Sequence, residues 1–432
     1  MIVHTTKPRV LLRGCRFVVT MDDGRILEKV DILLEDGIIK EIAERIDEKD
    51  DVVVNCSDYV VMPGLVNCHT HAAMVLLRGY YDDAELHVWL NKMWEVESRL
   101  TPDIVYLASK LAILEMISTG TTAFVDMYFF PQATAKAAME MGIRAYLGPP
   151  FIDIILDRKE VMKELESFIK QYEKHELIRP IVNVHSIYTC DEETLLAAGE
   201  LSNRYDLLYH IHISETRKEV FECKKKHGVF PVEYLDRLGV LSERTLLVHL
   251  GWVTSWEIEL IRERKAKVVH CPTSNMKLAT AGFFPLKEML AQGVAVGLGT
   301  DGPASNNSLD MFREMKTCVL LQRNNYWRTD VGAYDALLMA TAEASKILGI
   351  RTGMIRRGHL ADLVLLNSKS LRMMPLRKDN LVSNMVYSAT GGNVVMTIVN
   401  GRIVYDRSRH EELLEEAIRI SERLNNFIAK GH

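Results

Sequence analysis

Two histidines separated by one residue, His69 and His71, follow the apolar stretch 60–68. In a β-strand, side chains two residues apart share a face, so both imidazoles are expected to point the same way. Neutral imidazole nitrogens are ligands that transition metals prefer in proteins. The pair therefore predicts half of a metal site. The competing interpretation is two ordinary surface or core histidines.

Further candidate ligands end later apolar stretches. We assign His69, His71, His212 and Asp301 as metal ligands, because three imidazoles and one carboxylate suit a divalent metal with an open position for water. Asp301 has a competing interpretation as the cap of a following helix, since Asp is common before a Gly-Pro turn.

The stretch that carries His212 also carries His210, and the two share a strand face. Spacing alone does not decide which of them binds metal. We favour His212 because Glu215 follows three residues later, beyond the strand end, where a proton shuttle reaches a bound water. His270 is interpreted as a core residue or a residue that supports a metal ligand, in preference to a ligand itself. Cys68 is interpreted as buried packing that faces away from His69.

These residue types fit metal-assisted hydrolysis. A bound divalent metal lowers the pKa of its water toward ~7, and a nearby carboxylate takes the proton and delivers it to a leaving nitrogen. Glu215 suits that role, and His249 suits a hydrogen bond to the nucleophile or the developing alkoxide. The glycines of 297–302 formally match a dinucleotide-binding motif, but the stretch contains Asp301 and runs into Pro303 instead of a helix.

The elements that must position these residues alternate between strand and helix from about residue 64. Eight strands predict a closed (β/α)8 TIM-type barrel over residues 63–356, with function where the strands end. An open doubly wound sheet is the rival and is disfavoured by the count of eight. The strands are expected at 65–69, 122–126, 144–147, 181–185, 208–213, 245–249, 267–270 and 294–298.

Both ends of the chain are predicted to be β. Asp36-Gly37 and Asn400-Gly401 are hairpin signals between β-prone runs. We expect residues 1–62 and 357–432 to build one composite β-sandwich domain beside the barrel. An amphipathic helix is expected at 411–428.

The composition is typical of a soluble globular protein: 432 residues, 48% hydrophobic and 26% charged. A net charge of -5 and a pI near 6.3 argue against nucleic acid or a membrane surface as the main partner. No uncharged apolar run approaches the roughly 18 residues of a membrane span, and nothing resembles a signal peptide. Seven scattered cysteines without a Cys-x-x-Cys pair favour a cytoplasmic location.

Four stretches resemble the amidohydrolase superfamily: 63–71, 212–216, 247–249 and 299–302. Over its whole length the chain resembles the mononuclear deaminase branch, which acts on S-adenosylhomocysteine, 5'-methylthioadenosine and 5'-deoxyadenosine. The resemblance implies that the four assigned ligands hold zinc, or iron in some relatives, that Glu215 carries protons to the purine ring, and that His249 orients the hydroxide. The fourth strand ends without the lysine that binuclear relatives carry there, so one metal per subunit is expected.

The resemblance also implies substrate contacts. Trp89 and Glu97 match residues that meet the ribose, His185 matches a base-contacting histidine, and Ser305 matches a polar contact to the ring. The competing interpretations are a core tryptophan at 89 and a solvated helix residue at 97.

Relatives that accept S-adenosylhomocysteine place an arginine near its amino-acid tail, one of them after the third strand. This chain has Gly148-Pro149-Pro150 there, and Arg158 from the following loop is the candidate replacement. We therefore expect a preference for small or neutral 5' groups.

The sequence predicts hydrolytic deamination of an adenosine-type nucleoside to its inosine analogue and ammonia, with Asp301 accepting the hydroxide proton. One alternative is deamination of another aminated ring, such as guanine or a triazine, because enzymes acting on those rings share the ligands. The other is a catalytically silent scaffold, which is disfavoured because such proteins usually lose ligands. We expect a homo-oligomer that binds a small nucleoside and neither nucleic acid nor membrane.

Overall fold

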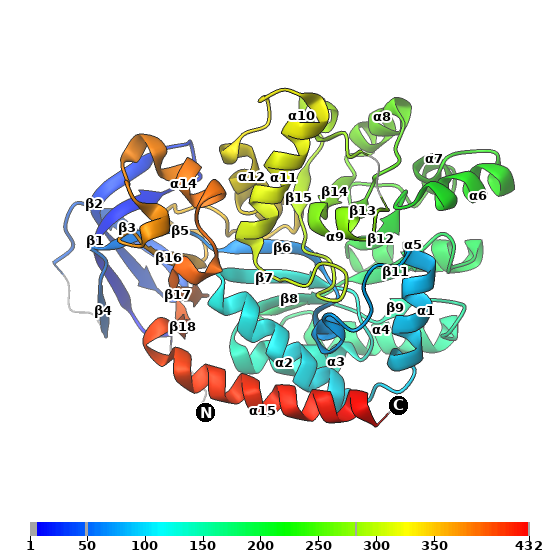
Figure 1. Ribbon diagram of the computed structural model, residues 1–432, viewed down its shortest axis with the longest axis horizontal. Coiled ribbons are helices and arrows are strands. Elements are labelled where there is room, and N and C mark those ends of the chain that lie inside the picture. The colour runs from blue at the N-terminus through cyan, green and yellow to red at the C-terminus, as the bar shows by residue number, and fades with distance from the viewer. Residues whose placement is uncertain (1–6, 48–50, 281–282, 431–432) are drawn as a thin grey trace.

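Parallel strands alternate with helices through the middle of the chain in the computed structural model, which describes residues 7–47, 51–280 and 283–430 (Figure 1). A strand lies at each of the eight predicted positions. These strands are β6 (Leu65–Thr70), β7 (Thr121–Asp126), β8 (Arg144–Leu147), β11 (Val182–Ser186), β12 (Tyr209–Ile213), β13 (Thr245–His249), β14 (Lys267–His270) and β15 (Val296–Leu298).

The parallel strands are hydrogen-bonded as two sheets, where the sequence predicted one closed ring. One sheet has the order β10-β8-β7-β6 and the other β15-β14-β13-β12-β11-β9, with short additional strands β9 (Pro150–Phe151) and β10 (Ile178–Pro180). The sheets are separated at two places, between β6 and β15 and between β8 and β11, and Pro149, Pro150 and Pro180 lie at the second. Proline has no backbone N–H to donate to a ladder, which accounts for the interruption between β8 and β11.

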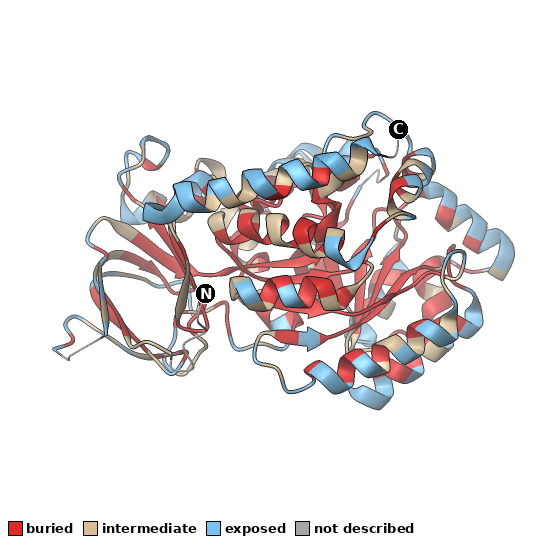
Figure 2. Cartoon of the chain, turned by 90° about the horizontal axis from the view of Figure 1, so that it is seen from below, coloured by how far each residue is buried: buried red, intermediate tan, exposed pale blue. Residues whose placement is uncertain are grey.

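Helices surround these strands and bury one face each, as Figure 2 shows by the red inner and blue outer sides of the ribbons. None of the helices in the described ranges combines the length and the apolar character needed to cross a bilayer. The helices are α1 (Leu86–Glu97), α2 (Pro102–Ser118), α3 (Pro131–Met141), α4 (Arg158–Tyr172), α5 (Glu192–Tyr205), α6 (Arg217–His227), α7 (Pro231–Arg237), α8 (Ser255–Glu263), α9 (Pro272–Lys277), α10 (Leu286–Ala291), α11 (Met311–Tyr326), α12 (Ala333–Met339), α13 (Ala342–Ile347), α14 (Leu381–Tyr387) and α15 (His410–Ala429).

Both chain ends join one sheet at the side of the parallel strands, with the order β18-β17-β16-β5-β1-β2-β3 and β4 paired to β1. This is a single hydrogen-bonded sheet, where the sequence predicted a sandwich. Its strands are β1 (Val10–Val19), β2 (Ile26–Glu35), β3 (Ile38–Ala43), β4 (Val52–Asn55), β5 (Tyr59–Pro63), β16 (Leu363–Asn367), β17 (Val394–Val399) and β18 (Arg402–Asp406).

Two hairpin turns of this sheet lie where the sequence predicted them. Asp36 and Gly37 join β2 to β3 with φ of 54° and 80°, and Asn400 and Gly401 join β17 to β18 with φ of 54° and 75°. Asp and Asn tolerate the left-handed conformation, and glycine adopts it without steric cost.

A buried ion pair connects this sheet to the parallel strands. Arg144 on β8 donates from Nε and Nη2 to the two carboxylate oxygens of Asp362, at 2.6 and 3.0 Å. Asp362 also accepts from the backbone N–H of Asn400 at 2.7 Å. The amphipathic helix predicted at 411–428 is present as α15, and it lies along α2 (Figure 1).

Candidate metal and catalytic site

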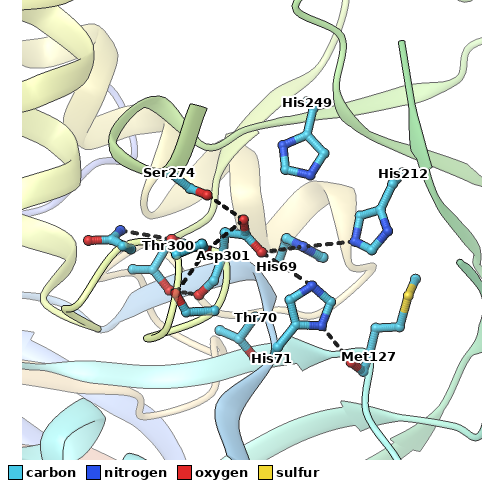
Figure 3. A network of polar contacts seen from close by, with 12 residues as sticks. His69, Thr70, His71, Met127, His212, His249, Ser274, Thr300 and Asp301 are labelled. Atoms are coloured by element: carbon cyan, nitrogen blue, oxygen red, sulfur yellow. Dashed lines mark hydrogen bonds and ion pairs between the residues drawn. The ribbon is translucent and has the colours of Figure 1, made fainter. Parts of the chain in front are cut away.

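Three imidazoles and one carboxylate converge at the carboxyl ends of β6, β12 and β15. His69 Nε2 lies 3.2 Å from Asp301 Oδ1 and 3.2 Å from His212 Nε2, and His71 Nε2 lies 3.2 Å from Asp301 Oδ1. The ligand atoms of the three histidines all lie within 4.8 Å of one another. Figure 3 shows the four side chains pointing toward one another, with His249 beside them. The structure thus brings together the four residues assigned as metal ligands.

The local fold aims Asp301 at the histidines. Its backbone N–H donates to the carbonyl oxygen of His69 at 3.0 Å, and its φ of 60° turns the chain away from the direction of β15. Asp tolerates this left-handed conformation better than most residues. The hydroxyls of Ser274 and Ser305 donate to Asp301 Oδ2, which leaves Oδ1 facing the imidazoles.

The donor set fits a divalent metal. His71 donates from Nδ1 to the carbonyl oxygen of Met127 at 2.6 Å, so the lone pair of its neutral ring is on Nε2, the atom that faces Asp301. The Nε2 atoms of His69 and His212 face each other at 3.2 Å, and two N–H groups cannot both fit between them. Converging ring nitrogens and a carboxylate are the arrangement that a bound cation stabilises.

Burial sets the protonation of these groups. It lowers the pKa of His69 to about 4 and holds the pKa of His212 well below its usual range. Burial also lowers the pKa of His71, but its hydrogen bond to the Asp301 carboxylate and the charge of that carboxylate outweigh burial and raise that pKa to about 9. Burial alone raises the pKa of Asp301, while His69 and His71 hold it well below the usual range. At neutral pH, His69 and His212 are therefore neutral and free to ligate, whereas a metal would have to displace a proton from His71.

Glu215 and His249 lie on the open side of this cluster, with Glu215 Oε1 3.9 Å from His249 Nε2. Glu219 accepts from the backbone N–H groups of Ser214 at 2.9 Å and Glu215 at 2.8 Å, which holds the turn after β12. Burial raises the pKa of Glu215, although the neighbouring His249 lowers it. A carboxyl with a raised pKa is suited to taking and returning a proton.

The imidazole of His249 is held by Asn275. The two are joined by a hydrogen bond of 2.8 Å between His249 Nδ1 and Asn275 Oδ1. An amide oxygen only accepts, so Nδ1 carries the proton and Nε2 faces Glu215.

The cluster opens into a cavity that Trp89, Glu97, His185 and Ser305 also line. Glu97 accepts a hydrogen bond of 2.7 Å from the Tyr128 hydroxyl. His185 Nδ1 lies 2.9 Å from the hydroxyl oxygen of Thr189. The indole N–H of Trp89 has no partner among the described residues. The side chains expected to contact a substrate are therefore around one cavity, with Arg158 as the exception.

Arg158 lies away from the cavity. It begins α4 and forms ion pairs with Asp191 at 3.2 Å and Glu193 at 2.6 Å. No lysine or arginine is among the lining residues within the described ranges. The replacement cation that the sequence suggested is therefore not brought to the site, because helix α4 directs Arg158 toward α5.

The structure also tests the predictions made for His270 and Cys68. His270 is buried with its ring stacked on Phe284, at a centroid distance of 3.9 Å, and is a core residue. Cys68 is buried in an apolar cluster with Val66 and Ile347, as predicted.

Sequence reasoning missed the groups that hold the site. Glu219 fixes the backbone of Glu215, and Ser274 binds the carboxylate of Asp301. His210 lies behind His69, with its Nε2 3.0 Å from His69 Nδ1, and does not belong to the ligand cluster. The available signals were the position of Glu219 four residues after Glu215 and the shared strand face of His210 and His212.

Comparison with known proteins agrees with this geometry. Residues 60–404 match the amidohydrolase family. The chain is 43% identical to the 5'-deoxyadenosine deaminase of Methanothrix thermoacetophila, over 93% of this chain and 97% of the relative. It is 39% identical to the 5-methylthioadenosine/S-adenosylhomocysteine deaminase of Pyrococcus furiosus, over 94% and 99% respectively.

A solved structure is similar over nearly its whole length. It is an adenosine deaminase from Xanthomonas campestris with bound zinc, with a TM-score of 0.91, 31% sequence identity, and coverage of 96% of this chain and 98% of that one. From the family match, the relatives and the shared fold, this chain belongs to the amidohydrolase family.

Proposed function

We propose that this protein is a metal-dependent aminohydrolase that converts an adenosine-type nucleoside to its inosine analogue and releases ammonia. The observation that carries the proposal is a four-residue ligand cluster that shares one cavity with Glu215 and His249. The names of relatives at 43% and 39% identity, both adenosine-type deaminases, support the substrate class.

The proposed metal is one zinc ion per subunit, with iron as the alternative, held by His69, His71, His212 and Asp301. Zinc is supported by the nitrogen-rich donor set and by the zinc in the solved adenosine deaminase. When bound, the metal makes a water acidic enough to be a nucleophile at neutral pH.

The side chains then divide the proton transfers between them. Glu215 takes a proton from the nucleophile and delivers it to the ring nitrogen beside the carbon under attack, which makes that carbon more electrophilic. His249 orients the nucleophile with Nε2, because its Nδ1 is held by Asn275. Asp301 accepts the second proton of the nucleophile as the tetrahedral species forms, and this proton is passed to the amino group, which leaves as ammonia.

The substrate contacts are proposed around the same cavity. His185 meets the base, Ser305 the ring, and Trp89 and Glu97 the ribose. The free indole N–H of Trp89 supports a donor role, and the half-buried Glu97 carboxyl offers acceptors to hydroxyl groups. Within the described ranges the cavity lining holds no lysine or arginine, so we propose a preference for neutral 5' groups over the charged tail of S-adenosylhomocysteine.

The parallel sheets are proposed to form one (β/α)8 barrel over residues 63–356. The proposal is supported by two backbone hydrogen bonds of 3.0 Å, from Asp301 to His69 and from Ile181 to Leu147, which link the sheets at both of their junctions. Residues 1–62 and 357–432 form the accompanying β domain in this proposal, and the homo-oligomer stays a prediction.

The decisive experiment is a spectrophotometric assay of zinc-loaded enzyme with adenosine, 5'-methylthioadenosine, 5'-deoxyadenosine, S-adenosylhomocysteine, guanine and an aminated triazine. We expect the highest kcat/KM for nucleosides with neutral 5' groups. A kcat/KM for S-adenosylhomocysteine equal to that for 5'-methylthioadenosine would contradict the 5' preference alone. Turnover of guanine or the triazine without nucleoside turnover would overturn the proposed substrate class.

A further inference from the structure

We propose that His210 and Asn183 form a hydrogen-bond relay that sets which nitrogen of His69 is free to bind the metal. His210 is thus a positioning residue, although it shares a strand face with the ligand His212. The inference rests on the metal site of the proposed function. It concerns which ring nitrogen carries the proton in two buried imidazoles and does not depend on which nucleoside is the substrate.

The relay begins at Asn183 on β11, whose amide orientation is fixed by its neighbours. Its Nδ2 donates two hydrogen bonds of 2.9 Å, one to the carbonyl oxygen of Asp126 and one to that of Gly148. Both amide hydrogens are therefore used, and Oδ1 is left as an acceptor. Asn183 is fully buried, so no solvent competes for these groups.

His210 is the second member. Its Nδ1 lies 2.8 Å from Asn183 Oδ1. Because an amide oxygen can only accept, the proton of this hydrogen bond is on His210 Nδ1. In the neutral ring, His210 Nε2 is then a bare acceptor.

The acceptor of His210 faces the ligand His69. His210 Nε2 lies 3.0 Å from His69 Nδ1, so His69 donates from Nδ1 and keeps its lone pair on Nε2. That Nε2 is the atom 3.2 Å from Asp301 Oδ1 and 3.2 Å from His212 Nε2. The opposite polarity would put a proton on His69 Nε2 and close the ligand position.

The proton position of His71, the ligand that follows β6, is fixed by the backbone itself. His71 donates from Nδ1 to the backbone carbonyl of Met127. His69 is fully buried, and the acceptor for its Nδ1–H is the imidazole of His210. In most metal sites the acceptor for a ligating histidine is a carbonyl, a carboxylate or a water. The neutral His210 adds no negative charge behind His69. Asp301 is then the only carboxylate among the four proposed ligands.

The test compares zinc affinity of apo enzyme by competition with a chromophoric chelator. His210→Leu removes both ring nitrogens and therefore the relay. His210→Gln replaces them with an amide N–H donor and an amide oxygen acceptor. Partners of ligating histidines typically contribute about 10–100-fold to metal affinity. We expect His210→Leu to bind zinc more weakly by about that factor, and His210→Gln to stay near wild type. Wild-type affinity in His210→Leu would overturn the relay, and so would equal losses in both variants.

A second measurement on the wild type covers the case in which His210→Leu fails to fold. Long-range ¹H–¹⁵N correlation spectra of histidine-labelled zinc enzyme report which ring nitrogen carries the proton. We expect the proton on Nδ1 of both His69 and His210, with the His210 signals identified by their loss in His210→Gln. A proton on Nε2 of His210 would overturn the proposal. Neither readout uses a substrate, so a failed deaminase assay leaves both outcomes interpretable.

Discussion

The Glu215 carboxylate and the His249 imidazole face each other, with Oε1 and Nε2 3.9 Å apart. They come from the ends of neighbouring strands, β12 and β13. Glu219 accepts from the backbone N–H of Glu215, and Asn275 holds the imidazole of His249. The space between them adjoins the ligand cluster and the cavity. This relationship fits the proposed roles, in which a proton acceptor and a hydrogen-bonding imidazole act on the same nucleophile.

Replacing Glu215 by glutamine is expected to remove the proposed proton shuttle while it keeps the shape of the side chain. We expect kcat to fall by about 10²–10⁴-fold, the usual contribution of general acid–base catalysis. Zinc content is expected to stay at the wild-type level, because Glu215 is not one of the four ligands. Steady-state kinetics and metal analysis check both statements. Glu222→Gln, on the exposed side of α6, is the matched control and is expected to behave as wild type.

Glu219 links stability to pH. Burial raises its pKa to about 8, whereas a glutamate in the unfolded chain titrates near ~4.3. The folded protein therefore holds a proton that the unfolded chain loses over this range. The stabilisation that Glu219 contributes is fully present below the pKa that it has in the unfolded chain. It is lost as the pH rises through about 8.

Glu219→Gln removes this titration. We expect the free energy of unfolding of the wild type to fall more steeply between about pH 5 and pH 8 than that of Glu219→Gln. Urea denaturation of the apo enzymes at several pH values measures the difference. Parallel pH profiles for the two proteins would show that Glu219 does not titrate in this range.

Gly299 allows β15 to approach β6 closely. A Cβ at this position would lie 2.9 Å from the Cβ of His69 and 3.0 Å from its backbone nitrogen. Gly299→Ala is therefore expected to displace His69 and to weaken zinc binding. Overpacking of this kind typically lowers the free energy of unfolding by about 1–3 kcal/mol. Chelator competition measures the affinity. The control is Gly392→Ala, whose Cβ would meet nothing closer than Thr390 Oγ1 at 3.5 Å.

The buried pair of Arg144 and Asp362 is expected to stabilise the junction between the two parts of the fold. Arg144→Met leaves the Asp362 carboxylate buried without its cation, which typically costs about 3–5 kcal/mol. Chemical denaturation should show that loss, while kcat of the folded fraction is unchanged. The exposed pair of Arg45 and Asp47 gives the comparison. Arg45→Met is expected to cost at most about 1 kcal/mol, and equal losses in both variants would refute the special role of the buried pair.

Much of the site was predictable from the sequence. Side chains alternate along a strand, and parallel strands end at one edge of a sheet, so His69, His71, His212 and Asp301 were expected to meet. Turn chemistry was equally local, because Asp36-Gly37 and Asn400-Gly401 need only their own φ angles. Eight strand positions followed from the alternation of apolar runs and helical patterns.

Other features depended on contacts between segments far apart in the chain. His210 and His212 share a face, and only their distances to His69 distinguish a relay from a ligand. Arg158 was expected near the substrate, but the path of α4 pairs it with Asp191 and Glu193. Local patterning determines which way a side chain points along its own strand or helix. Its distance from groups on other elements, and hence its protonation and its partners, is decided by packing of the whole chain.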